Sequence, residues 1–265
     1  AVAHRRIDGA RRGVITERRS AEDMTGAMYA AIAGLKTHMS KLNVVGNNIA
    51  NVNTVGFKAE RPSFAALMYD QIRGIGDEQL PRGNGTRMVM AKTDFSSGAM
   101  ATSSIAQSYA IEGDGFFALA DPGTGEISYT RDGSFTLSEY TQMGDDGQPE
   151  TVFYLSDGEG RFVLSNQGAP MEVTDPDAEM PVGVFDFVNT DGMVHVGSNR
   201  FVPVAKNGQV RMGAGVVRKG MLEQSNTDLA NEMVQVIEAQ RSFSYALRMV
   251  QTSDEVESTI NSLRG

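Results

Sequence analysis

Acidic side chains beside glycine are the residues of this sequence whose types and spacing could support catalysis or metal binding. Asp145-Asp146 and Asp157-Gly158-Glu159 could supply paired carboxylates, and Glu112 with Asp114 could flank a glycosidic bond as an acid and base pair. The run after Asp157 lacks the bidentate acid that an EF-hand calcium loop places at its twelfth position. All these acids fall at expected turns, where carboxylates are usually solvated. A glycan-acting enzyme or an adhesive β domain is therefore kept only as the alternative class.

Motifs for nucleophilic, metal-dependent or nucleotide-dependent chemistry are missing from the sequence. It contains no Cys, no Trp and three His, at positions 4, 38 and 195. No G-x-S-x-G, H-E-x-x-H or phosphate-binding Gly-Lys-Ser/Thr run occurs. The net charge of −9 disfavours nucleic acid, whose phosphates would be repelled, and no apolar run is long enough to span a membrane. We expect no enzymatic activity, cofactor, metal site, nucleic-acid partner or membrane insertion.

An apolar heptad near the C-terminus predicts one long helix that would dominate the architecture. No Gly or Pro occurs between Asn226 and Leu263, and the apolar positions alternate spacings of four and three. At about 1.5 Å per residue, such a helix is longer than a small domain, so its seam needs a long partner. The apolar seam positions are Leu229, Met233, Val236, Phe243, Leu247, Val250, and, after a one-residue step, Val256, Ile260 and Leu263.

A second heptad near the N-terminus supplies a partner of comparable length. Its positions are Met28, Ile32, Leu35, Met39 and Leu42. Gly26 and Gly34 each cost roughly 1 kcal/mol relative to Ala, so this helix is not expected to be stable alone. Small residues on its other faces would allow another element to approach closely. We predict that the two terminal helices pair as a coiled coil.

The first 23 residues differ in composition from the rest of the chain. They hold six Arg and four acids, and we expect them to be poorly ordered. Ala21-Glu22-Asp23 can be encoded by a purine-rich block of the kind that precedes bacterial start codons. We therefore hypothesise that Met24 is the native start and that residues 1–23 are a translated leader.

Short β-type runs punctuated by turns fill the middle of the chain. Asp-Gly pairs at 132, 146, 157 and 191 suit hairpins. The sequence therefore predicts an α+β protein with a central antiparallel all-β domain between two long helices. The expected segments are a leader (1–23), an N-terminal helix (24–58), an extended connector (59–106), the β domain (107–215) and a C-terminal helical segment (216–265).

Three motif clusters resemble the bacterial flagellar basal-body rod and hook proteins. The first is the run from Gly46 to Lys58, the second is Gly113 to Leu119 with Tyr129 to Phe135, and the third is Glu223 to Leu229 with its continuation through Asp254. The matching signature residues are Asn47, Asn48, Asn51, Thr54, Gly56, Phe57, Lys58, Asn226, Asp228, Gln240 and Arg241. The resemblance extends over nearly the whole of residues 24–263.

This resemblance implies a structural subunit rather than an enzyme. It implies self-assembly into a helical homopolymer that transmits torque, contacts with other rod and hook subunits, passage through the flagellar export apparatus, and a place in the periplasm-spanning basal body. The middle looks most like a distal-rod member, although the stretch between Tyr69-Arg73 and Leu80-Gly83 is shorter than in that pattern. A proximal rod or short hook protein therefore remains an alternative, and residues 141–171 match no pattern of the family.

Overall fold

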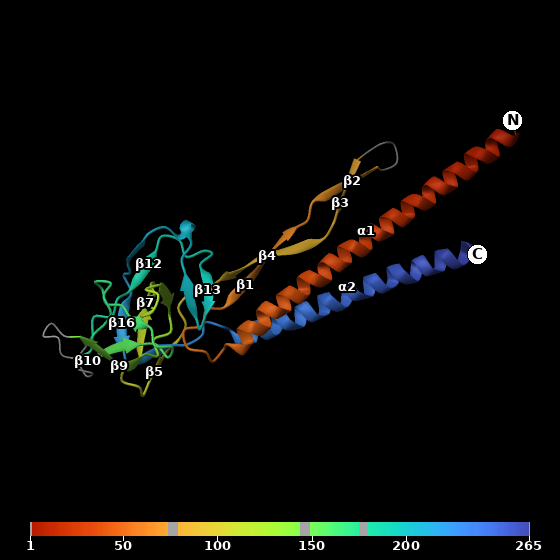
Figure 1. The fold of residues 1–265 in the computed structure, drawn as a ribbon. Helices are drawn as coiled ribbons and strands as arrows, with labels where there is room; N and C mark the ends of the chain where they lie inside the picture. The colour runs from red at the N-terminus through yellow and green to blue at the C-terminus, as the bar shows by residue number, and fades with distance from the viewer. Residues whose placement is uncertain (1, 74–78, 144–148, 175–179, 265) are drawn as a thin grey trace. The chain divides into compact units, whose positions relative to one another are not determined.

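The computed structural model describes residues 2–73, 79–143, 149–174 and 180–264 (Figure 1). Helix α1 covers Val2–Ala50 and helix α2 covers Leu229–Arg264. The strands are β1 Glu60–Ala66, β2 Tyr69–Arg73, β3 Gln79–Gly83, β4 Thr86–Thr93, β5 Met100–Thr102, β6 Tyr109–Glu112, β7 Phe117–Ala120, β8 Ile127–Thr130, β9 Thr136–Met143, β10 Pro149–Ser156, β11 Phe162–Val163, β12 Phe185–Phe187, β13 Val194–Gly197, β14 Arg200–Val202, β15 Val210–Met212, β16 Val216–Lys219 and β17 Met221–Glu223, with a 3-10 turn at Ala205–Asn207. The predicted α+β class with a mostly antiparallel β domain is confirmed.

The chain forms two compact units. The helical unit comprises residues up to 46, 62–91 and 230 onward, and the β unit comprises residues 47–61 and 92–229. Each unit thus combines segments from distant parts of the sequence. The β unit in particular is completed by residues on both sides of the central run of strands.

In the helical unit, the two helices meet near the C-terminal part of α1 and diverge toward the chain ends (Figure 1). Lys41 Nζ lies 3.7 Å from Glu238 Oε2, and Ala239 is buried at the same level of α2. The half-buried side of α2 continues through Phe243, Ala246 and Val250. This side keeps Val236, Phe243 and Val250 of the expected seam and adds the small residues Ala239 and Ala246, whereas Met233 and Leu247 are exposed.

A β ribbon occupies part of the face of α1. Strand β2 pairs with β3 in antiparallel register, and β1 pairs with β4. Thr37 Oγ1 donates a hydrogen bond to the Thr86 carbonyl at 2.8 Å, and a Cβ on Gly85 would come within 3.0 Å of the Ala30 carbonyl oxygen. The small side chains of α1 therefore admit this ribbon, whereas the sequence had suggested a plain extended connector over 59–106.

The β unit contains a seven-stranded antiparallel sheet in the order β13-β14-β8-β7-β11-β10-β9. Two-stranded sheets β12·β15, β16·β6 and β17·β5 complete the unit. Two apolar clusters fill its interior, one around Phe117 and Leu155 and one around Phe116 and Phe201. Alternating strand residues supply both clusters, as period-two burial requires.

Three segment boundaries differ from the sequence expectations. Helix α1 ends at Ala50, before the predicted bound of 58. Residues 216–223 form strands β16 and β17, so α2 begins at Leu229 rather than within the segment predicted to start at 216. Helix α1 includes residues 2–23, where little order was expected. Arg, Ala and Glu are good helix formers, so a helix that is fixed further along the chain can extend through them.

Candidate functional site

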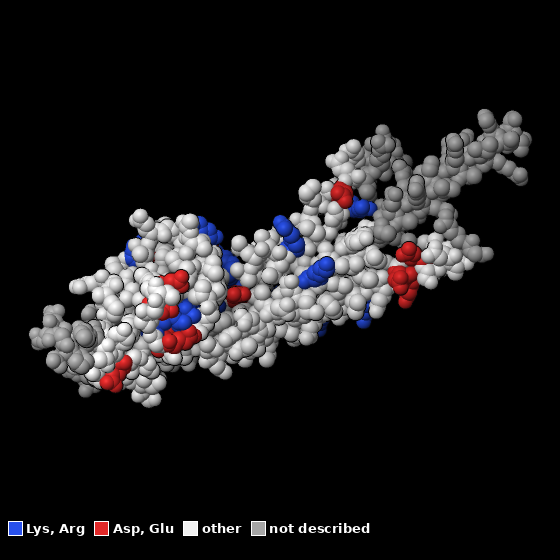
Figure 2. Space-filling model, in the orientation of Figure 1, with Lys and Arg blue, Asp and Glu red and all other residues white. Residues whose placement is uncertain are grey.

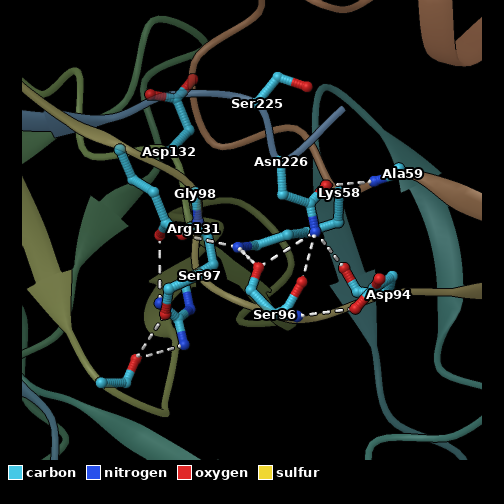
Figure 3. Close-up of polar contacts among 12 residues, drawn as sticks. Lys58, Ala59, Asp94, Ser96, Ser97, Gly98, Arg131, Asp132, Ser225 and Asn226 are labelled. Atoms are coloured by element: carbon cyan, nitrogen blue, oxygen red, sulfur yellow. Dashed lines mark hydrogen bonds and ion pairs between the residues drawn. The ribbon is translucent and has the colours of Figure 1, made fainter. Parts of the chain in front are cut away.

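A group of buried charges in the β unit joins the motif segment that follows α1 to the motif segment that precedes α2 (Figure 3). Lys58 Nζ donates hydrogen bonds to Glu223 Oε1 at 2.6 Å and to the Ser96 carbonyl at 2.8 Å. Arg131 Nη1 donates to Glu223 Oε2 at 3.1 Å. The Lys58 and Glu223 side chains are fully buried and that of Arg131 is 2% exposed. One carboxylate thus serves two buried cations that lie far from it in the sequence.

Asn226 joins the same group through its side-chain amide. Its Oδ1 accepts a hydrogen bond from the Ala59 backbone N–H at 2.8 Å, and its Nδ2 donates to the carbonyls of Asp94 and Ser96 at 2.7 and 3.1 Å. We call Lys58, Arg131, Glu223 and Asn226 the clasp. It fastens the segment after α1 to the segment before α2 through side chains and backbone together.

Glycines allow the backbones in the clasp to come close. Gly56 has φ +66°, and a Cβ there would lie 2.4 Å from the Asp132 backbone nitrogen. The Gly56 N–H donates to the Glu223 carbonyl at 2.8 Å. Gly98 donates its N–H to Glu223 Oε1 at 2.8 Å, and a Cβ on Gly98 would lie 2.0 Å from the Gln224 carbonyl oxygen. A side chain at Gly56 would push residue 56 away from the backbone of Arg131 and Asp132, and one at Gly98 would push residue 98 away from Gln224.

The asparagines at the end of α1 stabilise the turn that leads into the clasp. Asn48 Nδ2 donates to the Glu60 carbonyl at 2.8 Å, and its Oδ1 accepts from the Glu60 N–H at 2.9 Å. Asn51 Nδ2 donates to the Asn47 carbonyl, and Thr54 Oγ1 donates to Asn51 Oδ1 at 3.1 Å. These bonds satisfy backbone groups where the helix ends and the chain turns toward Gly56.

Burial and ion pairing act in opposite directions on the charges of this region. Burial lowers the pKa of Lys58 below its ordinary value, and Glu223 opposes this shift without cancelling it. Burial alone raises the pKa of Asp94, but hydrogen bonds from Ser96 and the guanidinium of Arg61 outweigh it and hold that pKa below its usual range. The clasp is thus a desolvated group whose stability depends on complete pairing.

The other motif residues lie outside the clasp. Asp228, Gln240 and Arg241 are exposed at the beginning of α2 and along it. Phe57 is buried beside Lys58, and Asn47 is exposed at the end of α1. Sequence reasoning did not single out Glu223 and Arg131 as site residues. Each stood inside a recognised motif cluster, but a single sequence carries no signal that pairs a glutamate with a lysine so distant from it.

The predicted seam residues differ in exposure within a single chain. On α1, Met28, Ile32, Leu35 and Leu42 are half-buried and Met39 is 50% exposed. On α2, Val236, Phe243 and Val250 are half-buried. The remaining α2 positions are exposed, namely Leu229, Met233, Leu247, Val256, Ile260 and Leu263. We call these six residues the outer stripe: Leu229, Met233 and Leu247 lie on one side of α2, and Val256, Ile260 and Leu263 lie about half a turn away, on the other side. On the face drawn in Figure 2, long stretches of the helices are uncharged.

Most of the acids considered for catalysis that the structure describes are held in surface ion pairs, and Asp114 is exposed beside the hollow described below. Glu112 pairs with Arg218 at 2.8 Å, and Asp157 and Glu159 both pair with Arg161. Asp145 and Asp146 lie outside the described residues. No group of three His, Asp or Glu side chains suited to a metal ion occurs among the described residues. Neither α1 nor α2, over the part searched, is long and apolar enough to cross a membrane.

A hollow of about 620 Å³ lies beside the clasp in the β unit. Phe116 and Arg131 contribute to its wall, and Arg131 stacks over the Phe116 ring at 5.5 Å. The other cations of the wall are paired with acids of the wall: Arg61 with Asp94, Lys92 with Asp191, and Arg211 with Asp186. The two charges of each pair neutralise one another, and such pairing is typical of a structural surface.

Comparison with known proteins identifies the family. Residues 28–58 match the flagella basal body rod protein model, residues 110–149 the flagellar hook protein FlgE/F/G D1 domain, and residues 218–263 the flagellar basal body rod FlgEFG protein C-terminal model. The flagellar basal-body rod protein FlgG of Borreliella burgdorferi is 30% identical, with 91% of this chain and 99% of that protein aligned.

Further relatives agree. The FlgG protein of Bacillus subtilis is 34% identical over 88% of this chain and 97% of its own length. The rod protein FlgF of Rhizobium meliloti is 28% identical over 91% of this chain and 99% of its own length. The similarity extends through both helices and the β unit, and the clasp joins residues from all three matched regions. The chain therefore belongs to the flagellar basal-body rod protein family.

Proposed function

We propose that this chain is a structural, non-enzymatic subunit of the bacterial flagellar basal-body rod, of the distal-rod type. The observation that carries the proposal is the outer stripe of α2, in a chain whose relatives over nearly its full length are rod proteins. Met233 is 54% exposed and Leu263 is 83% exposed among the residues that the structure describes. Exposed apolar stripes of this length are characteristic of assembly surfaces.

Self-assembly would bury this stripe. In the proposed tube, the terminal helices of each subunit pair as a coiled coil and pack against those of neighbouring copies. Heterologous contacts that do not close into a ring generate a helical filament of this kind. The exposed seam residues of α1 and α2 are then the contact residues between subunits, while the half-buried ones hold the helices of one subunit together. The filament would transmit torque along the rod.

The proposed partners follow from membership of the family. They are further copies of this chain, other rod and hook subunits at the ends of the polymer, and the flagellar export apparatus. A proximal-rod or short hook role is the second candidate, because a FlgF relative aligns over 91% of the chain and the matched D1 model covers hook proteins as well. As a rod subunit, the chain would lie in the basal body of the flagellum.

Electron microscopy of the purified full chain tests the assembly proposal. At concentrations well above those at which the chain is monomeric, we expect tubes or filaments. The variant Met233→Asp places a charge on the outer stripe and should remain monomeric, whereas Glu257→Ala alters an exposed charge of the same helix and should assemble normally. Monomers under all conditions, or equal assembly of both variants, would contradict the proposal.

A further inference from the structure

The clasp is assembled from three separate parts of the chain. Lys58 and Asn226 flank the central region, Arg131 follows strand β8, and Glu223 ends strand β17. The seven-stranded sheet, by contrast, lies entirely within residues 117–202, and the buried residues of its two apolar clusters lie within 109–201. The sheet can therefore form without residues 223–226, but the clasp cannot.

Without Glu223 the clasp holds uncompensated charge. Arg131 and Lys58 are almost fully removed from solvent, and Glu223 supplies both of their ion pairs. A buried cation whose partner is missing is far more costly than the intact pair is stabilising. A chain whose sheet has formed but whose residues 223–226 are not seated must either expose Lys58 and Arg131 to water or remain strained.

The segment that completes the clasp is also the last part of the β unit in chain order. Domains generally begin to fold from the N-terminal side during synthesis. The two cations are thus in place before their carboxylate. Seating the segment adds several contacts at once: Glu223 reaches both cations and the Gly98 N–H, its carbonyl accepts from Gly56, and Asn226 satisfies Ala59.

We propose that the clasp is a latch that closes last. It converts the β unit from a readily reopened form into a locked form only when the Glu223–Asn226 segment has docked. The docking site recognises a carboxylate and, three residues later, a side-chain amide. This setting rests on the proposed function: in a chain that passes through the export apparatus, the latch leaves the β unit unlocked until its C-terminal segment has docked.

The kinetics of folding distinguish a late latch from an ordinary stabilising pair. In the full-length chain, Glu223→Gln should raise the unfolding rate of the β unit on the order of 10²–10³-fold, while the refolding rate changes less than about threefold. The signal is the tyrosine fluorescence of the core, since the chain has no Trp. Glu112→Gln is the matched control, because it removes a glutamate whose pair with Arg218 is exposed.

Asn226→Ala provides a milder test in case Glu223→Gln does not fold. It removes the hydrogen bonds to Ala59, Asp94 and Ser96 without leaving a buried charge, and should accelerate unfolding roughly tenfold with the same small effect on refolding. The proposal is overturned if the change in the logarithm of the refolding rate accounts for half or more of the loss in folding stability. It is also overturned if Glu223→Gln behaves like Glu112→Gln. Measurements on dilute monomer give this answer whether or not the chain forms rods.

Discussion

Replacing Leu247 with Asp tests the outer stripe most directly. Leu247 lies on α2 and remains 41% exposed in the single chain. Complete burial of a leucine stabilises by about 1.5–3 kcal/mol, so covering the exposed share in an assembly contributes about 1 kcal/mol per subunit. Aspartate loses this contribution and must also be desolvated, which costs at least about 2 kcal/mol more.

The sum of about 3 kcal/mol corresponds to at least a hundredfold rise in the concentration needed for assembly. Sedimentation of polymer across a concentration series, with electron microscopy of the pellets, measures this rise. Leu247→Ala should give an intermediate shift of about fivefold. Glu238→Ala, on the same helix with a 64% exposed side chain, should shift assembly by less than about 1 kcal/mol.

Circular dichroism of each variant at low concentration separates assembly from folding. We expect the β signal of Leu247→Asp to match that of the unaltered chain, because the residue belongs to the helical unit. Assembly of this variant at the normal concentration, with a folded β unit, would show that the outer stripe is not the polymer contact. An unfolded monomer would show instead that Leu247 stabilises the single chain.

Three further outcomes are expected. In dilute monomer, amides of α2 beyond Val250 should exchange hydrogen faster than those of β7 and β8, because few apolar contacts protect that part of the helix. Mass spectrometry of the exchanged peptides measures the difference, and equal protection would contradict the prediction. Gly85→Val should weaken the packing of the ribbon on α1 by about 1–3 kcal/mol, since Gly85 has φ +96° and lies against Ala30. Chemical denaturation measures this loss, with Gly83→Ala as the control. Burial lowers the pKa of His195, and the charge of Glu60 opposes this shift only in part. The unfolded chain therefore binds the proton more readily, so the stability of the β unit should fall as the pH drops below 6.5. In thermal unfolding, His195→Gln should flatten that fall, whereas His38→Gln should leave the β unit unaffected.

The helices and the class of the β domain follow from sequence periodicity because burial imposes repeating patterns on the chain. The heptads located both helices, and Asp-Gly turns with short apolar runs indicated the antiparallel strands. Periodicity was a weaker guide to which side of α2 is buried in a single chain. Large apolar residues dominate the pattern, whereas the monomer buries Ala239 and leaves Met233 outside.

The clasp shows a different limit. The asparagine run and Gly56-Phe57-Lys58 were visible as a motif, but their role depends on contacts with Glu223 and Asn226 that span most of the chain. Charged residues at such positions are normally exposed, so composition argues against a buried site. The ribbon was missed for a related reason, because Gly and Pro between 74 and 85 suggested an unpaired connector and the pairing depends on a surface provided by α1.

The clasp also determines the path of mechanical load. Force applied along α1 enters the β unit through residues 51–58, and force along α2 enters through residues 223–228, immediately before that helix begins. These two entry points are bonded directly to each other, by Lys58 with Glu223 and by Gly56 with the Glu223 carbonyl. Tension between the helices is therefore carried across a few short contacts and bypasses the seven-stranded sheet. The sheet is mechanically shielded, so its outer strands can accept insertions without altering the stiffness of the load-bearing parts.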